Sequence, residues 1–161
     1  MKKISVYPKN KKKFLRLLKF AKEILDICRK VNVNPVVYGS LACFIYSKDK
    51  NMAVNDFDFL IPKNSFDKII HLLNENKIIY HYSVKWHTIQ IFNKNLKVEL
   101  DSIEYWQKNL SNKFEYLNLN GLKIKIISLN DLTKIYRKLA KIGRTNRKKK
   151  IEKYLMLKNL K

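Results

Sequence analysis

Two pairs of acidic residues constrain this chain most: Asp56 and Asp58 in the segment VNDFDFLIP, and Glu99 and Asp101 in LKVELDSI. Both segments alternate apolar and polar residues like β-strands, where residues i and i+2 share a face about 7 Å apart. The chain has 13 acids against 35 Lys and Arg, and no other two acids stand two residues apart. Crowded carboxylates repel unless a cation lies between them, and hard divalent cations prefer oxygen ligands. The pattern predicts a Mg²⁺ or Mn²⁺ site on one sheet face.

The chain is strongly basic, with a formal net charge of +22 over 161 residues. Clustered Lys and Arg attract polyanions, because they release counterions from a phosphate backbone. RNA is therefore one expected partner. A solvated lysine surface that serves solubility is the alternative.

Composition indicates one domain with one hydrophobic core. The longest uncharged apolar stretch, residues 36–46, is shorter than the roughly 18 residues that span a bilayer. The N-terminal segment lacks the apolar stretch and cleavage site of a secretory signal. Cys28 and Cys43 lie in apolar patterns without metal-binding spacing, which indicates reduced core residues. We expect a cytoplasmic protein with no membrane partner.

Apolar spacing predicts an α/β (α+β) fold with a mixed central sheet flanked by helices. The expected helices cover residues 11–31, 40–47, 64–77 and 128–142, and a last helix carries Ile151, Tyr154 and Leu155. The expected strands cover residues 36–38, 54–61, 78–84, 86–92 and 96–103, and the hairpin strands 114–119 and 122–127 flank Asn120 and Gly121. We expect residues 1–127 to form the α/β core and residues 128–161 to form a C-terminal helical hairpin packed on the same domain.

A family resemblance lies in the segment 36–61. A buried strand ends at Gly39 and Ser40, a short helix follows, and Asp56 and Asp58 form a DxD pattern on the next strand. This order resembles the polymerase β-like nucleotidyltransferase superfamily. The fifteen residues between Ser40 and Asp56 are similar to the spacing in its lincosamide nucleotidyltransferase-like and AbiEii-like branches, as is the later segment ISLNDLTKIYRKLAKIGR.

The resemblance implies a nucleotidyltransferase fold and the transfer of a nucleoside monophosphate from a Mg²⁺-bound NTP to a hydroxyl group. It implies that Asp56 and Asp58 bridge the metal ions. A third carboxylate would hold the metal beside the acceptor hydroxyl and help to accept its proton. Asp101 is favoured for that position, and Glu99 is the alternative.

The resemblance also places the triphosphate. Gly39 would let the backbone approach it closely, and Ser40 would offer amide and hydroxyl donors at the start of a helix. Those branches often carry Arg or His just before the DxD pattern, whereas this chain has Asn55 there. Lys48 or Lys50 is therefore the expected phosphate contact.

The sequence leaves the acceptor open. An RNA end such as that of tRNA suits the charge, while a protein side chain, as in toxin-antitoxin relatives, and a small molecule such as an antibiotic are the other candidates. The alternative to an enzyme is a nucleic-acid-binding or antitoxin-like module that keeps the nucleotidyltransferase fold without turnover.

Overall fold

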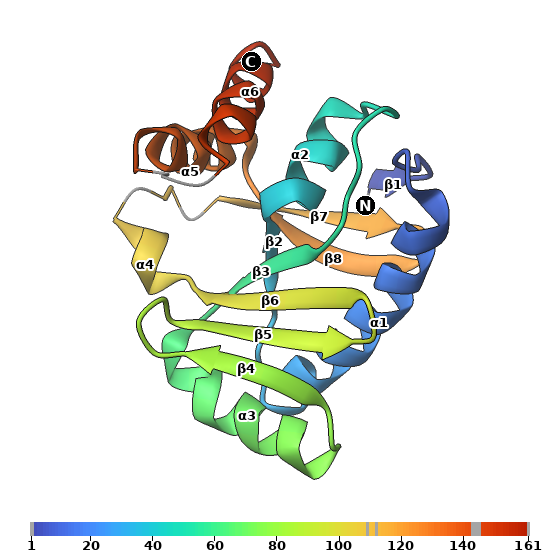
Figure 1. Cartoon of the computed structure of the whole chain (residues 1–161), viewed down its shortest axis with the longest axis vertical. Helices are drawn as coiled ribbons and strands as arrows, with labels where there is room; N and C mark the ends of the chain where they lie inside the picture. The colour runs from blue at the N-terminus through green and yellow to red at the C-terminus, as the bar shows by residue number, and fades with distance from the viewer. Residues whose placement is uncertain (1, 109, 112, 143–145, 161) are drawn as a thin grey trace.

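The computed structural model describes residues 2–108, 110–111, 113–142 and 146–160. At its centre is an eight-stranded mixed sheet in the order β1-β7-β8-β2-β3-β6-β5-β4 (Figure 1). The strands are β1 (Lys2–Ile4), β2 (Val36–Tyr38), β3 (Phe57–Ile61), β4 (Ile79–Ser83), β5 (Thr88–Asn93), β6 (Leu96–Ser102), β7 (Phe114–Leu119) and β8 (Leu122–Ile127). The mixed α/β architecture predicted from the sequence is confirmed.

Helices lie against the sheet and at one end of it. They are α1 (Lys11–Lys30), α2 (Gly39–Ser47), α3 (Phe66–Glu75), α4 (Glu104–Gln107), α5 (Leu129–Ile142) and α6 (Arg147–Lys158). The long helix α1 packs against β6 and α3, while α5 and α6 pack against each other and against α2 (Figure 1). Among the described helices, none is long and apolar enough to cross a membrane.

Aromatic and aliphatic side chains fix which face of β3 and β6 points to the core. Phe57 and Phe59 are buried, and the ring of Phe14 on α1 packs edge-on against Phe57 at 5.6 Å between centroids. On β6, Val98 and Leu100 are fully buried on the same side of the alternation. Because neighbouring residues of a strand point to opposite faces, the acids between them face away from this core.

Several local predictions are confirmed and others shift. Asn120 and Gly121 both have positive φ angles, 48° and 89°, as a type I′ hairpin turn requires. The segment expected to extend from residue 54 as a strand becomes regular only at Phe57, so Asp56 lies just before β3. The segment 84–87 is a turn, and β5 begins at Thr88.

The last helix forms as predicted, and its Tyr154 packs against the core, but the prediction is wrong for the other two apolar residues. Ile151 and Leu155 are 37% and 50% exposed, whereas Leu157 is fully buried. The helix α6 therefore packs through Tyr154 and Leu157, which lie three positions apart on one helix face. The end expected for the preceding helix at Gly143 lies outside the described residues.

Candidate active site

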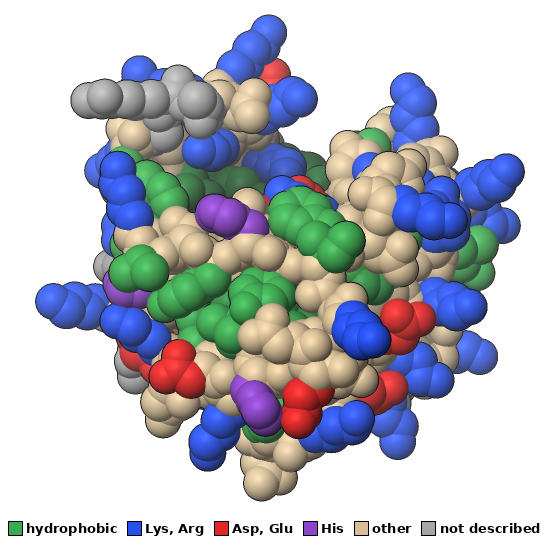
Figure 2. Space-filling model, turned by 60° about the horizontal axis from the view of Figure 1, so that its bottom comes forward, with side chains coloured by type: hydrophobic (Ala, Val, Ile, Leu, Met, Phe, Trp, Pro, Cys, Tyr) green, Lys and Arg blue, Asp and Glu red, His purple; other side chains and the backbone are tan. Residues whose placement is uncertain are grey.

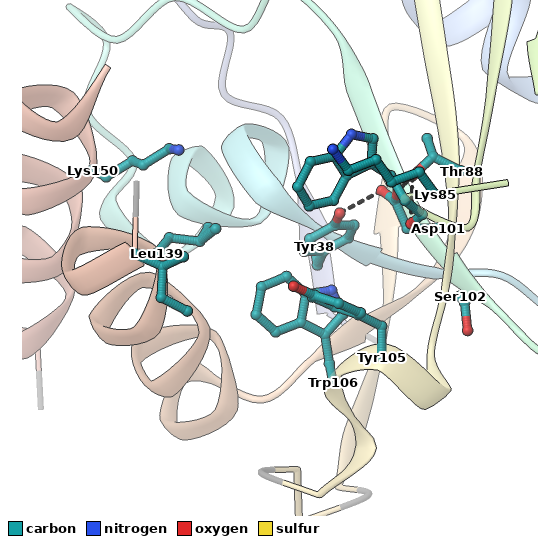
Figure 3. Close-up of a pocket in the computed structure, with 11 residues that line it drawn as sticks. Tyr38, Lys85, Thr88, Asp101, Ser102, Tyr105, Trp106, Leu139 and Lys150 are labelled. Carbon is teal, nitrogen blue, oxygen red and sulfur yellow. Dashed lines mark hydrogen bonds between the residues drawn. The ribbon is translucent and has the colours of Figure 1, made fainter. Parts of the chain in front are cut away.

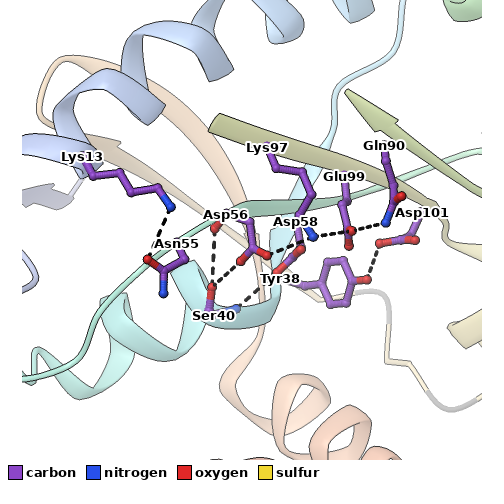
Figure 4. Close-up of polar contacts among 10 residues, drawn as sticks. All are labelled: Lys13, Tyr38, Ser40, Asn55, Asp56, Asp58, Gln90, Lys97, Glu99 and Asp101. Atoms are coloured by element: carbon purple, nitrogen blue, oxygen red, sulfur yellow. Dashed lines mark hydrogen bonds and ion pairs between the residues drawn. The ribbon is translucent and has the colours of Figure 1, made fainter. Parts of the chain in front are cut away.

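Strand register brings the two acidic pairs to one face of the sheet. β3 and β6 run parallel with Asp58 opposite Glu99, and Asp101 lies opposite Leu60. β2 runs antiparallel to β3 and places Tyr38 opposite Asp58. Figure 4 shows the four carboxylates along this face, with Asp56 directly before β3.

A lysine lies between two of these acids. The Nζ atom of Lys97 is 3.2 Å from Asp56 Oδ2 and 2.7 Å from Glu99 Oε1 (Figure 4). Gln90 Nε2 also donates to Glu99 Oε1 at 2.7 Å. Partial burial alone would lower the pKa of Lys97, but the hydrogen bond to Glu99 and the two negative charges raise it. Asp56 and Glu99 therefore converge around a single ammonium group.

No role for Lys97 was predicted from the sequence. The signal was present, because alternation puts a residue two positions before Glu99 on the same side of the strand. Its partner Asp56, however, comes from a distant segment, and only the pairing of β3 with β6 joins them.

Gly39 is required by the close approach of Asp58. Its φ angle is +67°, and a Cβ atom at this position would lie 1.9 Å from Asp58 Oδ2. The backbone N–H of Ser40 donates to the same oxygen at 3.4 Å. The Ser40 hydroxyl lies 3.4 Å from both the backbone oxygen and Oδ1 of Asp56. The predicted Gly-Ser turn thus begins α2 directly against the DxD pair.

The charge of Asp58 lacks a matching cation. Burial is the largest cause that raises the pKa of its carboxyl well above the usual value, and the charges of Asp56, Glu99 and Asp101 add to it. Among the described side chains, no Lys or Arg forms an ion pair with Asp58 or Asp101. Unpaired, crowded carboxylate oxygens are the donor set that a hard divalent cation prefers.

The side chains do not yet form a closed metal cage. Within the described ranges, no three His, Cys, Asp or Glu side chains form a cluster that could hold an ion as they lie. The donor chemistry nevertheless fits Mg²⁺, because a divalent ion would remove the repulsion around Asp58 by drawing the carboxylates towards itself.

Asp101 has a different environment from the other acids. Its two carboxylate oxygens accept hydrogen bonds from the hydroxyls of Tyr38 and Thr88. Burial raises the pKa of Asp101 to about 6, although the hydrogen bonds from Thr88 and Tyr38 oppose this. Burial and the neighbouring Asp101 charge also raise the pKa of Tyr38, which keeps its hydroxyl protonated as a donor.

A cleft opens beside Asp101 and away from the Lys97 end of the site. Its volume is about 550 Å³, and Figure 3 shows it between the strand ends and the helices α5 and α6. The residues that line it are Tyr38, Lys85, Trp86, Thr88, Asp101, Ser102, Tyr105, Trp106, Leu139, Ile142 and Lys150. The aromatic rings in this cleft come from separate segments, so no local pattern in the sequence brings them together.

Lys48 and Lys50, the lysines expected to contact phosphate, lie at the C-terminal end of α2 and in the turn after it. Lys48 ends α2 in a left-handed conformation with φ 54°, at the opposite end of the helix from Ser40, and Lys50 lies in the turn that follows. Neither forms an ion pair with a carboxylate of the site in the described structure. Instead, Lys13 on α1 lies 3.5 Å from the side-chain oxygen of Asn55, directly before the DxD pair (Figure 4). No local sequence signal identified Lys13.

Basic side chains border one face of the molecule. Figure 2 shows Lys and Arg distributed around the rim of one face, with few acids and with hydrophobic side chains gathered over its centre. This face is consistent with the net charge of +22, because its charged side chains are mostly basic.

Comparison with solved structures identifies the fold. The chain is similar to ANT(2")-Ia in complex with adenylyl-2"-tobramycin, with a TM-score of 0.66, 9% identity, and coverage of 90% of this chain and 88% of that one. It is also similar to the lincomycin-bound lincosamide antibiotic adenylyltransferase LnuA, with a TM-score of 0.59, 14% identity, and coverage of 89% and 97%. A putative nucleotidyltransferase from Thermotoga maritima matches with a TM-score of 0.55, 21% identity, and coverage of 87% and 92%.

The chain has the nucleotidyltransferase fold, which confirms the fold expected from the sequence. No family model and no curated protein sequence matches the chain. The similarity to the solved structures therefore lies in the arrangement of the sheet and helices. At such low sequence identities, it shows a shared fold and nothing more.

Proposed function

We propose that this protein transfers a nucleoside monophosphate from an NTP to a hydroxyl group of an acceptor. The observation that carries the proposal is the convergence of Asp56, Asp58 and Glu99 beside the Gly39–Ser40 turn on a nucleotidyltransferase fold. Two of the similar structures support the proposal. LnuA is an antibiotic adenylyltransferase, and ANT(2")-Ia was solved in complex with an adenylylated antibiotic.

Register favours Glu99 over Asp101 as the third metal ligand. Glu99 lies opposite Asp58 and, through Lys97, close to Asp56, whereas Asp101 lies opposite Leu60. In this proposal Asp56, Asp58 and Glu99 hold Mg²⁺ or Mn²⁺, which when bound stabilises the charge on the attacking and leaving oxygens. Asp101, held by two hydroxyl donors, faces the acceptor.

The other residues bind and orient the substrates. The start of α2 at Gly39 and Ser40 offers backbone donors to the triphosphate, in the way that helix N-termini bind phosphate groups. The acceptor oxygen forms a bond to the α-phosphorus, and the bond from this phosphorus to the β-phosphate oxygen breaks. Pyrophosphate leaves, and the hydroxyl proton passes to a carboxylate of the site.

A label-transfer assay tests this function. The protein is incubated with each α-³²P-labelled NTP, Mg²⁺ or Mn²⁺, and total RNA, total protein or a panel of antibiotics. We expect label on one acceptor class, complete loss with EDTA because the carboxylates lose their counter-ion, and complete loss in Asp56→Ala/Asp58→Ala. RNA binding that is equal in wild type and double mutant, with no label on any acceptor, would instead support the module without turnover.

Substitution of Lys97 tests whether its ammonium occupies part of the metal site. We expect Lys97→Met to bind Mg²⁺ on the order of tenfold more tightly, because a divalent and a monovalent cation about 5 Å apart in water repel by about 1–2 kcal/mol. The rise in melting temperature during a Mg²⁺ titration measures this affinity. Lys94→Met, in the exposed turn before β6, is the matched control, and equal affinities in both variants would exclude the overlap.

A further inference from the structure

Aromatic rings are exposed in the cleft beside Asp101. They have no role in binding the metal ion or the triphosphate in the proposed function. Trp86 is 60% exposed and Tyr105 is 46% exposed, while Trp106 forms a buried part of the same wall. Both tryptophans of the chain line this cleft. Large rings exposed together in a concave site provide flat surfaces on which another ring can stack.

Lysines surround these rings. Lys85 Nζ lies 5.2 Å from the ring centroid of Trp86, and Lys138 Nζ lies 5.0 Å and 5.1 Å from those of Tyr105 and Trp106. Lys150 of α6 reaches the cleft from the opposite wall (Figure 3). Among the residues that line the cleft, Asp101 is the one acid. The walls are therefore aromatic and positive, with one carboxylate at the end nearest the site.

We infer that this cleft is the acceptor subsite and that it binds the 3′-terminal nucleoside of a single-stranded RNA. This inference rests on the proposed function, since it assigns the acceptor. The terminal base stacks on Trp86 or Tyr105, the backbone phosphates lie along Lys85 and Lys150, and the terminal ribose hydroxyl faces Asp101. Stacking on aromatic rings combined with a positive groove is the general mode of single-strand binding.

Charge and size favour this occupant over a polycationic drug. A cationic aminoglycoside such as the tobramycin in the ANT(2")-Ia complex would meet three lysines around the cleft and one acid. A volume of about 550 Å³ falls within the range of small-ligand pockets, which accommodate one nucleoside with its phosphate. Because a cleft of this size admits one end of a polymer, the rest of the strand lies on the basic surface outside it.

Tryptophan fluorescence measures occupancy directly, because both tryptophans line the cleft. We titrate the full-length protein at about 50 mM salt with an RNA of roughly ten nucleotides that ends in a 3′ hydroxyl. We expect saturable quenching, and much weaker quenching by the same RNA with a 3′-terminal phosphate, whose charge would lie against Asp101. Equal quenching by the two RNAs, or quenching by tobramycin in place of RNA, would overturn the inference.

Variants separate stacking from general charge. Affinity, followed by fluorescence anisotropy of labelled RNA, is expected to fall roughly 5- to 150-fold in Trp86→Ala, as alanine substitution of a stacking ring predicts. Trp86→Phe is expected to keep most of the affinity. Lys150→Ala is expected to weaken binding more than Lys149→Ala, which removes the same charge from an adjacent residue that does not line the cleft. Unchanged affinity in Trp86→Ala would contradict the inference.

The outcome is independent of catalysis. Asp56→Ala/Asp58→Ala is expected to show the same preference for the 3′ hydroxyl end as wild type. If this preference holds but no RNA is labelled in the transfer assay, the proposed function fails and the cleft assignment stands. If label appears on another acceptor and Trp86→Ala has no effect on it, the cleft assignment alone fails.

Discussion

Asp58→Asn is expected to abolish nucleotidyl transfer and at the same time to raise the melting temperature of the metal-free protein. Transfer should fall by more than about 100-fold, since even outer-shell partners of metal ligands contribute 10- to 100-fold. The gain in stability follows from the repulsion around the carboxyl, which burial and three neighbouring acids leave unrelieved. The amide oxygen of Asn can still accept the hydrogen bond from Ser40.

The sign of the stability change follows from the pKa. The pKa of Asp58 in the folded protein is raised above its unfolded value, so the folded state holds this proton more tightly. Stability is therefore lost as pH rises from about 4 towards the folded pKa, because the unfolded chain releases this proton more readily, and the penalty is absent at lower pH. Removing the charge is expected to add on the order of 1 kcal/mol near pH 7, or about 2–4 °C.

Thermal unfolding in EDTA at pH 5 and pH 8 measures this effect, and label transfer measures activity. The gain should be larger at pH 8 than at pH 5, because the penalty in the wild type grows as pH rises from the unfolded pKa towards the raised folded pKa. Asp26→Asn, which changes an exposed acid paired with Arg29, is the control and should change neither quantity. A lower melting temperature for Asp58→Asn, or transfer close to that of wild type, would contradict the carboxylate site.

Gly39→Ala is expected to unfold or inactivate the protein. The added Cβ would lie 1.9 Å from Asp58 Oδ2, and the φ angle of +67° is itself unfavourable for Ala. Left-handed strain and overpacking together are expected to cost about 2–5 kcal/mol. Any folded fraction must displace Asp58, so transfer should also be lost.

Gly121→Ala provides the matched control. Its φ angle of +89° is also unfavourable for Ala, but nothing lies within 4 Å of the added Cβ. We expect a cost of about 1–2 kcal/mol from the backbone alone, with transfer unchanged in the folded protein. Urea unfolding gives both costs. Equal destabilisation of the two variants would mean that the contact between Gly39 and Asp58 is less close than the structure places it.

Local sequence patterns predicted the strands and the turn that carry the site. Such patterns arise because each residue of a strand is either buried or exposed according to the face on which it lies. Alternation of Phe57 and Phe59 with acids fixed the inner face of β3, and the same alternation on β6 placed Glu99 and Asp101 together. The Gly-Ser turn followed from a buried strand that ends at a helix start. These features needed no knowledge of how the strands pair.

The pairing of the strands could not be predicted from the sequence, and it determines which side chains meet in the site. Whether Glu99 or Asp101 lies opposite Asp58 depends on the register of β3 with β6, and a shift along the strand changes the answer without changing any local pattern. Lys13 meets Asn55 across 42 positions, and the cleft joins rings from a turn and from α4. Long-range contacts of this kind carry no local periodicity.

The turn at residues 84–87 carries Lys85 and Trp86 outside the strands that hold the acids. Loops tolerate insertion and exchange far better than paired strands do. If this turn selects the acceptor, lineages with this fold can acquire new substrates by remodelling a few positions there, while the reaction machinery stays as inherited.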